Sequence, residues 1–237
     1  MDEPPSSDHA KVAVGRRVFL AVAALGGAGI AFGAKAQDLA GTVLGSGLGS
    51  LLPGGDRFRI YSITGSYPEI SDSSYRLEVS GLVENPFSLT LAELKALPAH
   101  EMVKAFHCVT GWRVPDVHWK GVPLTHLLRA AGVRPDAVAV SFDSYDGADS
   151  ESLTIDQAHL PDVMVAYEML GGPVTTEHGG PVRLVVPQMF GYKSLKWLSR
   201  IRVVNQVEPG YWEQNGYPVN AWIDGTTGPT NPDPEMT

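Results

Sequence analysis

The chain has 237 residues, 43% of them hydrophobic and 19% charged, which is enough apolar content to bury the core of one domain. Its 26 glycines and 18 prolines follow no collagen-like period, so they favour a loop-rich mixed fold over a helical bundle. The formal net charge of -8 argues against nucleic-acid binding, and any anionic ligand would need a local basic pocket.

Residues 1–36 are predicted to be a twin-arginine export signal. Arg16 and Arg17 precede the apolar run 21–33, and a small-x-small cleavage site ends at Ala36. The alternative is an uncleaved membrane anchor, because the apolar run approaches the length that spans a bilayer. Either interpretation places the protein in the periplasm or another extracytoplasmic space. Twin-arginine export carries folded proteins, often with a cofactor inserted, so the signal itself hints at a cofactor.

The rest of the chain divides into a flexible linker at 37–56, one folded domain at 57–225 and a mobile tail at 226–237. Thr90 and Glu93 form a capping box that predicts a helix ending at Leu97, and Gly132 ends a second predicted helix at 124–131. A polar loop is expected at 143–152. Apolar patterns predict strands at 75–83, 102–106, 138–142, 163–169, 182–186 and 201–204.

Cys108 is the only cysteine, so a disulfide within the chain is excluded. An unpaired thiol outside the cytoplasm is exposed to oxidation, and it must be buried, paired with another chain or used as a ligand. The simplest alternative is a small buried hydrophobic residue.

The stretch from His178 to Gln206 contains basic residues and no acidic one, although the whole chain is acidic. Within it, residues 191–196 combine a glycine, a hydroxyl and two ammonium groups, and backbone amides there could also bind phosphate oxygens. The alternative is a solvated strand edge guarded by lysines. The basic residues of the stretch are Arg183, Lys193, Lys196, Arg200 and Arg202.

His107, Cys108 and Trp112 follow an apolar strand, which places an imidazole, a thiol and a large aromatic ring together. A thiolate suits a soft, high-valent metal better than magnesium or calcium. Zinc is disfavoured because neither HExxH nor CxxC occurs. A cysteine hydrolase with His107 or His178 as its base stays open, although neighbours on a strand point to opposite faces.

Seven blocks of the chain carry a resemblance to a known family. They are 81–86 (GLVENP), 108–112 (CVTGW), 119–124 (WKGVPL), 167–169 (YEM), 178–187 (HGGPVRLVVP), 191–196 (GYKSLK) and 210–212 (GYW). With these blocks in order, residues 76–217 resemble the molybdopterin-binding domain of the sulfite oxidase family. The resemblance is strongest to its short bacterial branch, which includes the periplasmic methionine sulfoxide reductase catalytic subunit.

The resemblance implies an α+β fold with a mixed, mostly antiparallel sheet and a molybdopterin cofactor carrying molybdenum. The family's metal-bonding cysteine falls on Cys108, and Tyr145 is a candidate for a phenol near the metal. Arg183 would offer a fork to phosphate or pterin oxygens, whereas Lys193 and Lys196 would act as point charges. The candidate cofactor-binding residues are Arg59, His107, Ser144, His178, Arg183, Lys193, Ser194 and Lys196.

The implied reaction is oxygen-atom transfer to or from a small or protein-bound sulfur substrate or a similar one. Electrons would pass singly to or from a partner such as a c-type cytochrome or membrane haem protein, because the chain has no haem motif or iron–sulfur cysteine set. Only a short segment follows Val204, so we expect a monomer without the dimerisation domain of true sulfite oxidases. Two departures from the family pattern leave the substrate open between sulfite and methionine sulfoxide. Arg113 alone represents the arginine-rich segment of sulfite oxidases, and His178 replaces an asparagine of the reductase branch. A cofactor-free extracellular binding module stays the main alternative from another functional class.

Overall fold

The computed structural model describes residues 58–223, so the predicted export signal, linker and tail lie outside the described residues. The described residues fall into two units, the short segment Cys108–Trp112 and all the others. Each unit is described by itself.

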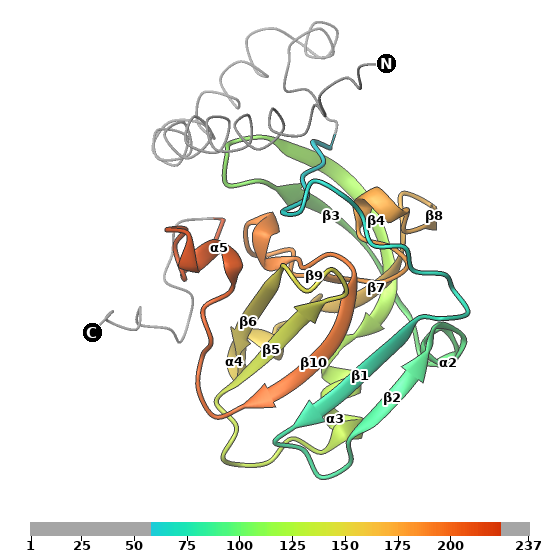
Figure 1. Cartoon of the computed structure of the whole chain (residues 1–237), viewed down its shortest axis with the longest axis vertical. Helices are drawn as coiled ribbons and strands as arrows, with labels where there is room; N and C mark the ends of the chain where they lie inside the picture. The colour runs from blue at the N-terminus through green and yellow to red at the C-terminus, as the bar shows by residue number, and fades with distance from the viewer. Residues whose placement is uncertain (1–57, 224–237) are drawn as a thin grey trace, which may run out of the picture. The chain divides into compact units, whose positions relative to one another are not determined.

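The first sheet of the larger unit has five strands in the order β2-β1-β10-β5-β6 (Figure 1). Strand β10 lies in the middle and pairs in parallel with β1, with Val79 opposite Ile201, whereas the other pairs are antiparallel. The strands are β1 (Arg76–Gly81), β2 (Phe87–Thr90), β5 (Ala139–Ser144), β6 (Ser150–Thr154) and β10 (Leu198–Val204).

The second sheet is antiparallel throughout. Its order is β3-β4-β7-β8, and β9 pairs with β7 as well. The strands are β3 (His100–His107), β4 (Arg113–Pro123), β7 (Met164–Met169), β8 (Gly172–Pro173) and β9 (Arg183–Val185). The expected mixed, mostly antiparallel α+β fold is therefore confirmed.

The helices are short, and residues at their ends explain where α2 begins and where α3 ends. Thr90 caps α2 with the reciprocal Thr90–Glu93 hydrogen bonds of a capping box, as predicted. Helix α3 ends at Gly132, whose φ of 68° is the left-handed conformation that glycine tolerates best. The helices are α2 (Leu91–Ala96), α3 (Leu124–Ala131), α4 (Ile155–Ala158) and α5 (Tyr211–Gln214), with 3-10 turns η2 (Thr176–His178) and η3 (Gly191–Lys193).

One hydrophobic core joins the two sheets and α3. Helix α3 buries Leu124, Leu127, Leu128 and Ala131, a spacing that places them on one face. That face packs in the same cluster as buried side chains of β1, β5, β7, β9 and β10. Full burial of each large apolar side chain stabilises the fold by about 2 kcal/mol.

Four strands differ from the sequence-based expectation. Strands β2, β4 and β8 were not predicted, and β6 occupies residues that were expected to belong to the polar loop 143–152. The loop is therefore confined to 145–149, where it joins β5 to β6. Among residues 58–223, no helix is long and apolar enough to cross a membrane.

Candidate functional site

Arg183, on β9, is a buried cation without a carboxylate partner among residues 58–223. Its side chain donates to the carbonyl oxygens of His178 at 2.7 Å and Ser194 at 2.9 Å. The guanidinium carbon lies 5.6 Å from the ring centroid of Phe106 and 5.5 Å from that of Trp119. Burial lowers the pKa of Arg183 to about 10, yet the group is still charged at neutral pH. A buried charge held by carbonyls and aromatic rings can accept an anionic ligand at its remaining N–H groups.

Lys196 adds a second positive charge to the same region. Its ammonium donates to the carbonyl oxygens of Tyr61 and Glu177 and lies 4.4 Å from the centroid of the Trp197 ring. Burial, followed by the charge of Arg183, lowers the pKa of Lys196 to about 8. No carboxylate within the described ranges pairs with this ammonium at ion-pair distance, so Arg183 and Lys196 together leave positive charge for a phosphate-bearing ligand.

His178 and Gly179 bring the backbone close to these cations. Burial, and then Arg183, lower the pKa of His178, so the imidazole is neutral at pH 7. A Cβ on Gly179 would lie 2.6 Å from Cβ of Lys196, which shows that glycine is needed for this close approach.

Ser194 is buried, and its oxygen atoms hold the neighbouring strands. Its hydroxyl oxygen accepts the backbone N–H of Val186 at 3.0 Å, while its carbonyl accepts from Arg183. The Ser194 carbonyl therefore lies beside the Arg183 guanidinium.

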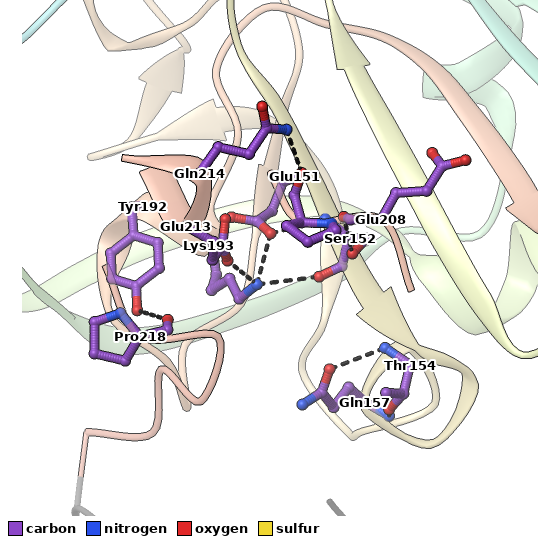
Figure 2. Close-up of polar contacts among 11 residues, drawn as sticks. Glu151, Ser152, Thr154, Gln157, Tyr192, Lys193, Glu208, Glu213, Gln214 and Pro218 are labelled. Carbon is purple, nitrogen blue, oxygen red and sulfur yellow. Dashed lines mark hydrogen bonds and ion pairs between the residues drawn. The ribbon is translucent and has the colours of Figure 1, made fainter. Parts of the chain in front are cut away.

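Lys193, three residues before Lys196, is directed elsewhere (Figure 2). Its ammonium donates to Glu151 at 2.6 Å, to the carbonyl of Ser152 at 3.2 Å and to Glu213. An ammonium has three N–H donors, and these three acceptors use all of them. The geometry therefore opposes the predicted contact of Lys193 with a phosphate.

Ser144 and Tyr145 lie at the end of β5 and in the loop that follows. Ser144 is buried, and its hydroxyl oxygen accepts the backbone N–H of Asp146 at 3.4 Å. The Tyr145 hydroxyl accepts the backbone N–H of Arg76 at 2.7 Å and donates to the carbonyl of the same residue. The Tyr145 hydroxyl is therefore hydrogen-bonded to the start of β1. A catalytic role would require it to contact the substrate or cofactor in addition to, or in place of, these bonds.

Asp146 and Asp149, in the same loop, were not predicted. Burial, followed by repulsion from Asp146, raises the pKa of Asp149 to about 7, whereas the charge of Lys196 opposes the rise. Oδ2 of Asp146 and Oδ1 of Asp149 are buried and accept no hydrogen bond from the described residues. From the sequence alone, this acidic loop looks like an ordinary solvent-exposed turn. Only the structure shows that these carboxylate oxygens are buried.

The Cys108–Trp112 segment is a tight turn that follows β3. The backbone N–H of Cys108 donates to the carbonyl of Trp112 at 2.8 Å, and the N–H of Gly111 donates to the carbonyl of Cys108 at 3.0 Å. The Cys108 sulfur lies 3.2 Å from the Thr110 hydroxyl oxygen. The Cys108 side chain is half-buried.

The remaining predicted residues are His107 and Arg59. His107 is the half-buried last residue of β3, and Arg59 is exposed near the start of the described chain. Within residues 58–223, no group of three His, Cys, Asp or Glu side chains could hold a metal ion.

Comparison with known proteins agrees with this chemistry. A family model described as the oxidoreductase molybdopterin binding domain matches residues 64–212. The chain belongs to this molybdopterin-binding oxidoreductase family. The family and the cofactor expected from the sequence are thereby confirmed.

Curated relatives extend the comparison. The chain is 37% identical over 155 residues to the uncharacterized oxidoreductase YuiH of Bacillus subtilis, covering 65% of this chain and 78% of the relative. It is 37% identical over 160 residues to a putative protein-methionine-sulfoxide reductase subunit, YedZ1, of Azospira oryzae, covering 67% of this chain and 58% of the relative. It is 31% identical over 179 residues to the sulfite oxidase of Gallus gallus, covering 63% of this chain and 39% of the relative. The chain thus spans less than two thirds of the length of the last two relatives.

A solved structure supports the fold as well. The sulfane dehydrogenase SoxCD from Paracoccus pantotrophus matches with a TM-score of 0.55 at 26% identity, over 60% of this chain and 41% of that one. For this molybdopterin-binding oxidoreductase, the buried charge of Arg183 and the half-buried charge of Lys196, neither in an ion pair within the described residues, fit a cofactor that carries a phosphate.

Proposed function

We propose that this protein is a molybdenum-dependent oxidoreductase that moves an oxygen atom to or from a sulfur-containing substrate. Cys108 would hold the metal of the molybdopterin cofactor. The observation that supports this most is the buried positive charge of Arg183, with the half-buried charge of Lys196 near it, in a chain of net charge -8. A cation that is buried without a carboxylate is costly unless an anionic ligand offsets it.

The protein's own residues would bind and orient the cofactor. Arg183 would donate its remaining N–H groups to the phosphate, and Lys196 would supply a second charge. His178, neutral at pH 7, would donate or accept one hydrogen bond, and Ser144 would offer its hydroxyl. Arg59 and His107 would provide further contacts to the cofactor. When bound, the cofactor supplies the two-electron oxygen-transfer chemistry.

The sulfur substrate is inferred from the names of relatives. Protein-methionine-sulfoxide reductases and sulfite oxidases are among them, and the structural neighbour is a sulfane dehydrogenase. Assays with free and peptide-bound methionine sulfoxide, and with sulfite, using artificial electron donors and acceptors, would identify the substrate class. Turnover of none of these compounds by molybdenum-loaded protein would contradict a sulfur substrate.

Electron exchange and location complete the proposal. We expect a cytochrome or a membrane haem protein as partner, export by the twin-arginine route and a monomeric protein. Replacing Arg16 and Arg17 by lysine should retain the protein in the cytoplasm, as cell fractionation would detect. Unchanged export of that variant would exclude the twin-arginine route, and analytical ultracentrifugation would test the monomer.

The decisive experiment is elemental analysis of protein purified from a host that makes molybdopterin. Wild type should carry about one molybdenum per chain, and Cys108→Ala should lose the metal or all oxygen-transfer activity, since the thiolate is the proposed protein ligand. Wild type from a host that lacks the cofactor is the control. A wild type without molybdenum under permissive conditions would favour a cofactor-free binding module instead.

A further inference from the structure

Three charged side chains are buried together away from Arg183. Lys193 of η3 contacts Glu151 of β6 and Glu213 of α5, and the three side chains are 3%, 0% and 1% exposed (Figure 2). We call these residues the Glu151–Lys193–Glu213 cluster. It joins three elements that are distant in sequence.

The cluster holds more acid than base. Two carboxylates face one ammonium, and Oε2 of Glu151 and Oε2 of Glu213 are both buried without a hydrogen-bond donor from the described residues. A net negative charge in such a site is costly, so one carboxyl group is expected to keep its proton.

Glu151 is the carboxyl that the surroundings select. Burial and then repulsion from Glu213 raise the pKa of Glu151 well above its ordinary value, although Lys193 opposes the rise. The other titratable groups nearby are the Tyr192 hydroxyl, which donates to the carbonyl of Pro218 at 2.6 Å, and Asp149, whose pKa Glu213 helps to raise. Neither adds positive charge to the cluster.

The position of Lys193 connects the cluster to the candidate cofactor site. It directly precedes Ser194, whose carbonyl accepts from Arg183, and Lys196 follows in the same segment. The rings of Tyr192 and Tyr217 lie 5.4 Å apart, which adds a second tie between η3 and the residues after α5. Fixing Lys193 therefore fixes the start of the segment 194–196.

We propose that the Glu151–Lys193–Glu213 cluster, with a proton retained on Glu151, positions the segment 194–196 for the cofactor without touching it. This inference rests on the proposed function for the identity of the ligand. The three residues are positioning residues, and the cluster makes α5 part of the support of the site.

Hydrogen exchange on the full chain without cofactor tests positioning independently of molybdenum. In Lys193→Met, which leaves a buried carboxylate unpaired, the amides of 191–196 should exchange at least about tenfold faster than in wild type. Glu151→Gln, which mimics a protonated carboxyl, should exchange within about twofold of wild type. Lys120→Met is the matched control, because Lys120 pairs with Glu101 at 2.9 Å on the surface.

The double variant Lys193→Met/Glu213→Gln keeps the test valid if a single variant does not fold. It leaves no unpaired charge, so the two sheets should fold while 191–196 still exchanges fast and molybdenum per chain falls at least about fivefold. Slow exchange in Lys193→Met or in the double variant would overturn the positioning role. Exchange in Glu151→Gln as fast as in Lys193→Met would overturn the placement of the proton.

The two proposals fail differently. If wild type takes up no molybdenum, the proposed function fails while the exchange comparison still decides whether the cluster orders 191–196. If wild type is loaded but the double variant retains the metal and exchanges slowly, the cluster is only a structural ion pair.

Discussion

At the scale of single residues, the candidate site depends on charges that the interior does not neutralise. Arg183 and Lys196 are held by carbonyl oxygens and aromatic faces rather than by carboxylates. Such contacts satisfy some of the N–H donors without cancelling the charge. The site therefore has a positive potential that attracts an anion even without a bound ligand.

Arg183→Lys should weaken cofactor retention although it keeps the charge. An ammonium cannot donate to His178 and Ser194 in a planar fork or stack equally well between Phe106 and Trp119. We expect molybdenum per chain to fall about tenfold and the unfolding free energy of cofactor-free protein to fall by about 1–3 kcal/mol. Metal analysis and urea unfolding measure these changes. Arg129→Lys, at an exposed position, is the control, and equal metal content in both variants would contradict the role of Arg183.

Asp149 should make the stability of cofactor-free protein depend on pH. Its pKa rises from 3.8 to about 7 on folding, so the native state holds a proton that the unfolded state has released between these values. Stability should therefore decrease as pH rises from about 4 to about 7, by an amount on the order of 2 kcal/mol. Asp149→Asn should flatten this dependence in urea unfolding, whereas Asp72→Asn, on the exposed surface, should not. A parallel pH dependence in both variants would exclude Asp149 as its source.

Lys196 gives a second pH test, on cofactor binding. With a pKa of about 8 in the cofactor-free protein, the Lys196 ammonium loses its proton above that pH, so the cofactor-free site should attract an anionic cofactor less strongly there. We expect cofactor release to accelerate several-fold between about pH 7 and pH 9, measured by metal retained after gel filtration. Lys196→Met should release cofactor fast at both pH values. A wild type that retains cofactor equally at both would show that Lys196 does not contribute.

At the scale of elements, η3 and β3 approach as closely as their side chains allow. A Cβ on Gly191 would lie 2.1 Å from the Phe106 ring, and Phe106 also lies against Arg183. A displacement of η3 or β3 would therefore move the Phe106 ring and, with it, a contact of the Arg183 guanidinium.

Gly191→Ala should consequently destabilise the protein by about 1–3 kcal/mol, because the ring must move out of a packed position. Thermal unfolding measures the change, and molybdenum per chain should fall with it. Gly172→Ala is the control, since a Cβ there meets nothing within 4 Å. Equal stability of the two variants would mean that the Phe106 ring of β3 can move aside without loss of unfolding free energy.

At the scale of the whole molecule, residues after the last strand belong to the support of the site. Glu208 accepts from Arg202 and Ser152, Glu213 accepts from Lys193, and Trp222 forms a β-bridge with Met189. These contacts connect the C-terminal segment to β6, β10 and η3.

Ending the chain after Gln206 should therefore be costly although every strand is retained. Loss of Glu213 leaves a buried ion pair incomplete, which costs about 3–5 kcal/mol and lowers Tm by about 10 °C. Calorimetry on the cofactor-free protein would measure this. A truncated protein with unchanged Tm would show that the sheets and α3 alone provide the stability.

The sequence by itself determined what depends on neighbouring residues. The capping box at Thr90 and the stop at Gly132 were predictable because a cap needs only residues within one turn. The order of the motif blocks around Cys108 and Arg183 indicated the family and its cofactor, and the family match confirmed them. Strand β4 was missed because it contains two prolines, a glycine and Asp116 at a φ of 51°, all typical of loops.

The tertiary structure decided which equivalent residues serve which purpose. Lys193 and Lys196 are three positions apart and were both predicted to face phosphate. One enters a carboxylate pair contributed by residues 42 and 20 positions away, and the other lies near Arg183. The parallel pairing of β1 with β10 likewise joins the two ends of the fold. Burial and long-range contact set the charge and direction of each side chain, and neither is a local property of the sequence.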